Sequence, residues 1–211
     1  MKKITLLDCT LRDGGYYNNW DFSNELVNEY LKVMSSVGIN YVELGFRSFK
    51  SRGFKGPSWY TTDSYIKSFK IPKSLKVAVM VNVSELISHP SGPIKAIKLL
   101  FKKSKNTKIK LVRLASHYEE FNTAAEVCKV LKNMGYEVGI NLMQISEQSK
   151  EKIISISKIA HDTKPDVLYF ADSLGSMLPL EISNLISNLR SHWKGPIGIH
   201  AHDNLKKAID N

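Results

Sequence analysis

Short apolar runs alternate along the whole chain with segments of a different hydrophobic spacing. The runs are rich in β-branched residues and occur at 4–9, 41–46, 77–83, 110–115, 137–142, 167–171 and 196–201. Between them, apolar residues recur at steps of three and four, as in 121–132, 153–160 and 182–189. Gly38 and Gly135 stand where two of these helices should end. The pattern predicts parallel strands joined by helical crossovers.

The spacing of the apolar runs fits two α/β folds, a (β/α) barrel and a doubly wound sheet. No G-x-G-x-x-G follows the first run, and polar residues cluster after the ends of the runs, which favours a TIM-type barrel. A complete barrel has eight units and about 250 residues. We therefore expect one domain over residues 1–211, an incomplete barrel of about seven β/α units. A truncated chain, an open barrel and an eighth element from a partner subunit are all compatible with this pattern.

Composition excludes several classes of protein. With 43% hydrophobic and 24% charged residues, the chain is neither disordered nor collagen-like. No apolar run approaches the length of a membrane helix, and Met1 to Thr5 lead straight into the first run, so we expect a cytoplasmic protein without a signal peptide. Cys9 and Cys128 are too few for a disulfide scaffold, and we expect both to be buried thiols.

The net charge of +10 is unevenly distributed. Residues 47–110 carry fifteen Lys and Arg against two acids, whereas the rest of the chain carries fifteen against eighteen. The lysines of this region lack the interleaved aromatic residues of a nucleic-acid platform, so no nucleic-acid partner is expected. The excess predicts either a solvated face or a surface that attracts an anionic substrate or a CoA-like nucleotide.

Two polar clusters lie at the ends of the first and the last runs. His200 and His202 are two positions apart on a strand and therefore present their imidazoles on the same side, as ligands of a divalent metal or as two structural histidines. Arg12 and Asp13 follow the first run. Because strand ends meet at one face of a barrel, Asp13 could complete a set of two histidines and one carboxylate, with Arg12 beside a developing anion. Alone, the Arg-Asp-Gly-Gly segment also reads as a surface turn.

Four segments together resemble the signature of the DRE-TIM metallolyase superfamily, the HMG-CoA lyase-like enzymes. They are DCTLRDG at 8–14, VRLASH at 112–117, FADSLGSM at 170–177 and GIHAHDN at 198–204. Within the superfamily, the segments at 112–117 and 170–177 are most similar to those of the 4-hydroxy-2-oxovalerate aldolases.

The resemblance implies a metal-dependent aldolase or lyase that cleaves or forms a carbon–carbon bond next to a 2-oxo acid, through a pyruvate-like enolate. Asp13, His200 and His202 would hold Mn²⁺ or Mg²⁺, and Arg12 would steady the enolate oxygen. Glu43 is expected close to the metal ligands, where Arg12, Arg47 or water would satisfy its charge.

Further residues are expected at the same mouth. Ser173 would contact the substrate carboxylate, and His117 would face the substrate from the end of the fourth strand. Asn204 is expected at the substrate or, together with Asp203, at the start of a following helix. The partner is then a small 2-oxo or hydroxy acid, with no membrane partner; an open sheet edge would also allow a homo-oligomer.

The sequence departs from the aldolase pattern at several points. Tyr16 stands where the aldolases carry a histidine proposed as general base, which makes Tyr16 a candidate proton-transfer group. Because a phenol is a weaker base at neutral pH, a different base and a different substrate also stay open. Leu174 replaces a glycine, and we expect no counterpart of the aldolases' C-terminal region, which docks a dehydrogenase. An acyl-CoA-condensing synthase of the same superfamily and a non-catalytic family member therefore remain as alternatives.

A long basic and aromatic segment at 46–62 follows the second run. At that position it would overhang the mouth of the barrel. We expect a lid that binds an anionic group of the substrate.

Overall fold

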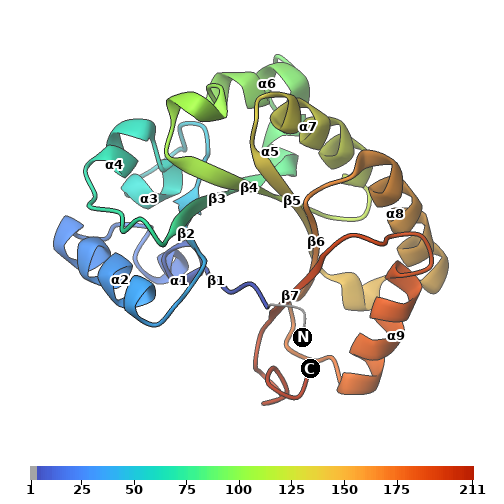
Figure 1. The fold of residues 1–211 in the computed structure, drawn as a ribbon. Coiled ribbons are helices and arrows are strands. Elements are labelled where there is room, and N and C mark those ends of the chain that lie inside the picture. The colour runs from blue at the N-terminus through green and yellow to red at the C-terminus, as the bar shows by residue number, and fades with distance from the viewer. Residues whose placement is uncertain (1–3) are drawn as a thin grey trace.

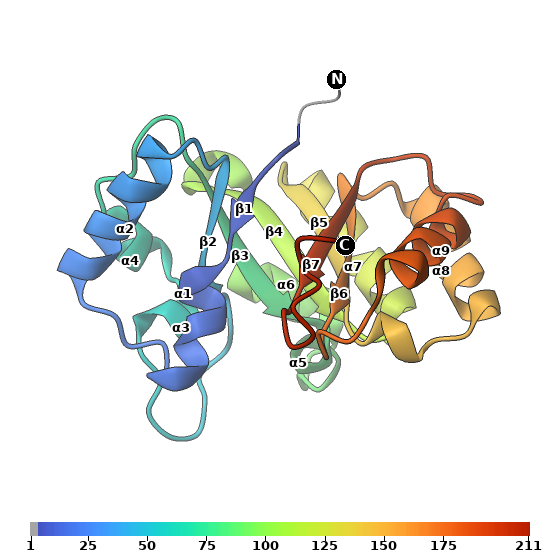
Figure 2. The same ribbon diagram turned by 90° about the horizontal axis from the view of Figure 1, so that it is seen from below.

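The computed structural model describes residues 4–211, which form a seven-stranded parallel sheet curled into part of a barrel (Figure 1). The strands pair in chain order: β1 Leu7–Asp8, β2 Tyr41–Phe46, β3 Lys76–Asn82, β4 Ile109–Ser116, β5 Glu137–Leu142, β6 Val167–Asp172 and β7 Ile197–Ala201. Figure 2 looks through the opening that is left between β1 and β7. The predicted incomplete TIM-type barrel is confirmed.

Helices connect the strands and cover the outside of the curl (Figure 1). Those of eight residues or more are α2 Asn24–Ser36, α6 Pro93–Leu100, α7 Phe121–Asn133, α8 Lys150–Thr163 and α9 Pro179–Leu189. Shorter ones are α1 Thr10–Asp13, α3 Pro57–Tyr60, α4 Asp63–Lys67 and α5 Val83–Ile87, with 3₁₀ turns at Gly14–Tyr17, Ser104–Asn106 and Ile145–Glu147. None of the helices described is long and apolar enough to cross a membrane.

The main core lies between the sheet and this outer layer of helices. Val112 and Leu114 of β4 are fully buried in it, together with Leu131 of α7 and Ile156 of α8. Arg113 lies between the two core residues of β4 and therefore points to the opposite face, into the curl. Because successive side chains of a strand point to opposite faces, the outer face of the sheet forms an apolar core while the inner face can carry polar groups.

Two helices end at the predicted glycines. Gly38 follows α2 with a φ of +82°, and Gly135 follows α7 with a φ of +91°. A side chain is strained in this left-handed region, so glycine fits both helix ends.

The two ends of the sheet differ from the prediction. The run at 4–9 forms only the two-residue β1; Ile4 and Leu6 are exposed, and the Leu6 amide donates to Asn40 Oδ1 at 2.9 Å. β1 has a strand on one side only, so there is no second neighbour to extend it. After β7 the structure has turns in place of the expected helix, and the Asp203 carboxylate accepts from the Ala208 amide at 3.0 Å.

Except for Lys55, the lysines of the basic region are exposed, as expected for a solvated face. Those between residues 102 and 110 surround the start of β4, at the edge of the sheet where strands begin. Arg47, in contrast, is buried and pairs with Asp63 at 3.4 Å. The lysines around the start of β4 therefore lie at the end of the sheet opposite to the polar cluster described next.

Candidate functional site

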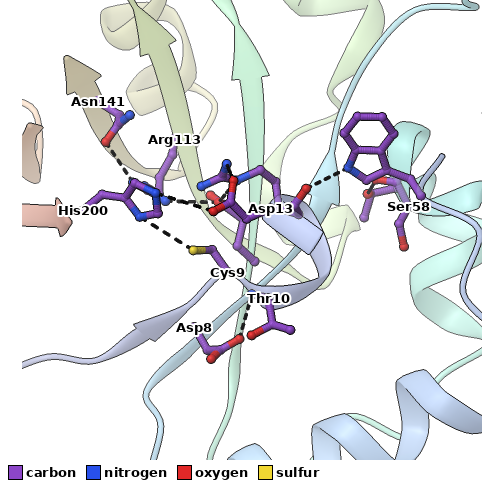
Figure 3. A network of polar contacts seen from close by, with 12 residues as sticks. Asp8, Cys9, Thr10, Asp13, Ser58, Arg113, Asn141 and His200 are labelled. Atoms are coloured by element: carbon purple, nitrogen blue, oxygen red, sulfur yellow. Dashed lines mark hydrogen bonds and ion pairs between the residues drawn. The ribbon is translucent and has the colours of Figure 1, made fainter. Parts of the chain in front are cut away.

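Polar side chains converge inside the curl, toward the edge where the strands end (Figure 3). They are Arg12 and Asp13 of α1, Glu43 of β2, Arg113 of β4, Asn141 of β5, His200 of β7 and His202 directly after it. Parallel strands bring their carboxyl ends to one edge, which explains why residues so far apart in sequence meet there.

The short helix α1 fixes Arg12 and Asp13. The Cys9 carbonyl accepts from the Asp13 amide at 2.8 Å, and the Trp20 indole donates to the Arg12 carbonyl, also at 2.8 Å. Gly15 lies under the same indole, because a Cβ there would come within 2.1 Å of the Trp20 ring. Arg12 is only 6% exposed, so the alternative of a surface turn is wrong.

Glu43 is completely buried between two guanidinium groups. Its Oε2 accepts from Arg12 Nε at 3.0 Å and from Arg113 Nη1 at 3.1 Å. Arg12 Nη1 also donates to Asp13 Oδ1 at 2.6 Å, and Arg113 Nη2 donates to Asn141 Oδ1 at 2.9 Å. Burial disfavours the charge of Arg12, but the Glu43 carboxylate outweighs it, so the pKa of Arg12 is raised. Arg12 is therefore held as a cation.

The guanidinium group of Arg113 stacks on the aromatic ring of Tyr169. The guanidinium carbon lies 4.4 Å from the centre of the Tyr169 ring. That ring occupies the space left by two glycines on the neighbouring strands: a Cβ on Gly198 would lie 2.3 Å from it, and one on Gly139 would lie 2.7 Å from it. The small residues therefore make room for the stack that orients Arg113.

His200 lies close to both other candidate metal ligands, His202 and Asp13. Its Nε2 is 3.3 Å from Nε2 of His202 and 3.7 Å from Oδ2 of Asp13. On the other side of the ring, Nδ1 lies 3.8 Å from the Cys9 sulfur. Cys9, Asp13 and His200 each offer a ligand atom within 4.8 Å of the others.

The surroundings set the charge of this group of residues. Burial, followed by the nearby Arg12 and Arg113, lowers the pKa of His200 to about 4. Burial also raises the pKa of the Cys9 thiol to about 11. His200 is therefore a neutral imidazole at pH 7 with a lone pair available, the form that binds a metal ion.

The other candidate residues lie outside this cluster. Tyr16 is 65% exposed and packs edge-on against Trp20, with ring centres 4.7 Å apart. The Ser173 hydroxyl accepts from the backbone amide of Gln144 at 3.2 Å. The side-chain amide of Asn204 donates to the backbone carbonyl of Leu174 at 2.8 Å. The His117 backbone amide donates to Glu120 Oε2 at 3.0 Å. All four follow the ends of β1, β4, β6 or β7, at the same edge as the cluster.

The segment at 46–62 is anchored at both ends. Phe46 and Trp59 pack with Trp20 in a small second core, and Lys55 lies 4.9 Å from the Trp20 ring. Residues 47–56 form an irregular loop that includes the exposed Phe54, and α3 follows it. The lid therefore stays a prediction, and it concerns only the irregular loop between the anchored residues.

Sequence reasoning gave no role to Cys9, Arg113, Asn141 or Tyr169. Cys9 was expected in a strand as a buried thiol; it follows β1 and is only partly buried, because it faces His200 and the open side of the sheet. Cys128 is buried as predicted. The signal available for Arg113 was a charge in the apolar middle of a strand, between Val112 and Leu114, which needs a buried partner.

A cavity of about 1200 Å³ lies beside the cluster on the open side of the sheet. Cys9, Arg113, Tyr169 and His200 line it, as do Tyr41 and Glu137 nearer the start of the strands. The polar cluster is thus accessible from the space between β1 and β7.

Comparisons with solved structures agree with this architecture. The N-terminal domain of an aldolase-like protein from Bacteroides vulgatus is 32% identical, with a TM-score of 0.80 over 96% of this chain and 66% of that one. HMG-CoA lyase from Bacillus subtilis is 15% identical, with a TM-score of 0.75 over 100% of this chain and 72% of the lyase, and supports the fold.

Curated relatives share the sequence over its whole length. 4-Hydroxy-2-oxovalerate aldolases from Bacillus cereus and Pelotomaculum thermopropionicum are 26% and 28% identical over 100% and 99% of this chain. The chain spans about 60% of the length of these relatives. The sequence model of the HMGL-like family matches residues 3–211. The chain therefore belongs to the HMGL-like family.

Proposed function

We propose that this chain carries the catalytic site of a divalent-metal-dependent aldolase or lyase that acts next to the carbonyl of a 2-oxo acid. The observation that carries the proposal is the convergence of Asp13, His200 and His202 beside the buried cation Arg12. The named aldolases among the relatives support the reaction class.

His200 lies close to both other proposed ligands, whereas the group whose ligand atoms all lie within 4.8 Å of one another consists of Cys9, Asp13 and His200. Nitrogen and oxygen ligands bind divalent ions at about 2.0–2.2 Å, which places neighbouring ligand atoms about 3 Å apart. The two imidazole Nε2 atoms are 3.3 Å apart, and Asp13 Oδ2 is 3.7 Å from the nearer one. Two imidazoles and one carboxylate suit Mn²⁺, and also Mg²⁺ with water in its remaining positions.

Charge balance favours an anionic substrate. Arg12 and Arg113 are offset by Glu43 and Asp13, so the site without an ion is close to neutral. A divalent ion then leaves two positive charges, which match the carboxylate and the enolate oxygen of a deprotonated 2-oxo acid. When bound, the ion would supply Lewis-acid stabilisation of that enolate.

Arg12 is placed to bind the enolate oxygen. Its Nε and Nη1 donate to Glu43 and Asp13, while its Nη2 has no hydrogen-bond partner among residues 4–211. A fixed donor in a buried site needs little reorganisation when the charge develops. Glu43 keeps this guanidinium in place from within the sheet.

The cleavage reaction also requires proton transfer. In a 4-hydroxy-2-oxo acid, the hydroxyl proton leaves, the bond between C3 and C4 breaks, and an aldehyde and the enolate of pyruvate form; the enolate then takes a proton at C3. We assign this transfer to Tyr16, which follows Asp13 by three residues. Ser173 and His117 would contact the substrate carboxylate and the leaving aldehyde.

Metal-dependent exchange of the methyl protons of pyruvate tests the proposal. The protein is stripped with chelator, and pyruvate is followed in D₂O by NMR with and without Mn²⁺; oxalate, an enolate analogue, should inhibit. We expect deuterium uptake that requires Mn²⁺ and is lost in His200→Ala. The melting temperature should rise with Mn²⁺ and rise further with oxalate. A protein that responds to neither ligand and exchanges no protons would be a non-catalytic family member.

A further inference from the structure

Cys9 contacts His200 at Nδ1, the ring nitrogen other than the one near Asp13 and His202. The sulfur lies 3.8 Å from Nδ1, whereas Nε2 is the atom near Asp13 and His202 (Figure 3). The two ring nitrogens point in different directions. The Cys9 sulfur lies within 4.8 Å of an Asp13 carboxylate oxygen, but its contact with His200 is at Nδ1, the nitrogen that an ion bound to Nε2 leaves free.

A neutral imidazole carries its proton on one nitrogen only, and the other nitrogen keeps the lone pair. We propose that Cys9 is a positioning residue for His200: its sulfur accepts the hydrogen bond from Nδ1–H and so directs the lone pair of Nε2 toward Asp13 and His202. The inference rests on the proposed function, in which this lone pair binds the ion.

The position of the sulfur is itself fixed. The Cys9 carbonyl accepts from the Asp13 amide at 2.8 Å, so the same residue contacts two of the three proposed ligands, Asp13 and His200. On the preceding residue, Asp8 Oδ1 accepts from the Tyr30 hydroxyl at 2.6 Å and from the Thr10 amide at 2.9 Å. These bonds hold the backbone on either side of Cys9.

The contact also crosses the open side of the sheet. Cys9 follows β1 and His200 belongs to β7, 191 residues later, and these two strands do not pair. No backbone ladder between them fixes the orientation of the His200 ring. A side-chain contact from β1 can supply that constraint, as partners on the second nitrogen do for metal-bound histidines.

Tautomer measurement tests this inference without any metal. Histidine ring nitrogen and carbon shifts in labelled, metal-free protein report which nitrogen is protonated, and His200→Ala assigns the signal. We expect His200 to be protonated on Nδ1 in the wild type, to become a mixture of tautomers in Cys9→Ala, and to return to Nδ1 in Cys9→Ser, whose hydroxyl can accept the bond. Cys128→Ala removes the other thiol, buried in α7, and should leave the tautomer unchanged.

Mn²⁺ affinity, measured by calorimetry, is the second readout. We expect Cys9→Ala to weaken binding about tenfold, as is usual for the partner of a metal-ligating histidine, and Cys9→Ser and Cys128→Ala to stay within twofold of the wild type. Cys9→Val, which fills the space without an acceptor, replaces the alanine variant if the latter does not fold. An unchanged tautomer in Cys9→Ala or Cys9→Val overturns the inference. If the wild type binds no Mn²⁺, the proposed function fails, and the tautomer alone decides the role of Cys9.

Discussion

Arg113 Nη1 donates to Glu43 Oε2 across 3.1 Å, and both side chains are at most 2% exposed. The two residues are 70 positions apart, on β4 and β2, and the same oxygen also accepts from Arg12. Breaking a buried ion pair by removing one charge is strongly destabilising, because the remaining charge stays buried without a partner.

Glu43→Gln therefore should lower the free energy of unfolding by about 3–5 kcal/mol, since it leaves the buried Arg113 without a carboxylate and Arg12 with Asp13 alone. Urea unfolding followed by circular dichroism measures the change. Glu137→Gln is the matched control: Glu137 pairs with Lys76 on the inner face of the sheet, but both side chains are more than 40% exposed. We expect its effect to be about 1 kcal/mol or less. Equal effects of the two substitutions would show that the buried charge of Glu43 contributes no more to stability than the exposed charge of Glu137.

A methyl group on Gly198 would strike the Tyr169 ring, 2.3 Å away. We expect Gly198→Ala to cost about 1–3 kcal/mol by overpacking, and to weaken oxalate binding because Tyr169 can no longer support Arg113. Gly14→Ala provides the comparison, since nothing lies within 4 Å of the added carbon and the backbone there is helical. Chemical denaturation of both variants, with oxalate titrated in the presence of Mn²⁺, distinguishes a steric effect at Tyr169 from a general effect of alanine.

The pKa of His200 predicts an acid-sensitive fold in the absence of metal. Burial and the two arginines lower this pKa from 6.5 to about 4, so between these values the unfolded chain binds a proton that the native state excludes. The free energy of unfolding should therefore fall as the pH drops from 6.5 toward 4, with a contribution of at most about 1.4 kcal/mol per pH unit.

The pH dependence can be isolated by substitution. In chelator-treated protein, His200→Gln should flatten the decline in stability between pH 6.5 and 4, whereas His161→Gln, on the exposed face of α8, should leave it as in the wild type. Urea midpoints at several pH values measure both. If the His200 variant loses stability as steeply as the wild type, another group causes the acid sensitivity.

Tyr16→Phe tests the assigned proton transfer. The hydroxyl is exposed, so its removal should leave the melting temperature unchanged while it slows Mn²⁺-dependent proton exchange of pyruvate about 100-fold. Tyr17→Phe removes a neighbouring hydroxyl on a side chain that is 96% exposed and should exchange at the wild-type rate. Wild-type exchange in Tyr16→Phe would assign the proton to another group.

Much of the fold could be predicted from local pattern. β2 to β7 coincide with the apolar runs to within one residue at each end, because strands buried on both sides need continuous apolar sequence. The prediction was wrong at 4–9 and after residue 203, where the sheet is open and the apolar residues have no neighbouring layer to cover them. Local pattern does not encode the absence of a neighbour.

The candidate site was predictable only where its residues share a short segment. His200 and His202 are two positions apart, and Arg12 and Asp13 are adjacent, so their association could be read from the sequence. The contacts of Arg113 with Glu43, and of Cys9 with His200, join residues 70 and 191 positions apart. Whether they meet depends on strand order and on which face of each strand they occupy.

The open side of the sheet makes the polar cluster a cross-link between the two ends of the described chain. Asp13 and His200 belong to elements that no backbone hydrogen bonds join, so a ligand that binds both closes a loop of almost the whole sequence. Closing so long a loop has a large cost in conformational entropy, so an ion bound by both residues stabilises only the fully assembled state. An ion at this position would stabilise the first and last strands against local unfolding at the same time. Hydrogen exchange at both strands should therefore slow when the ion binds.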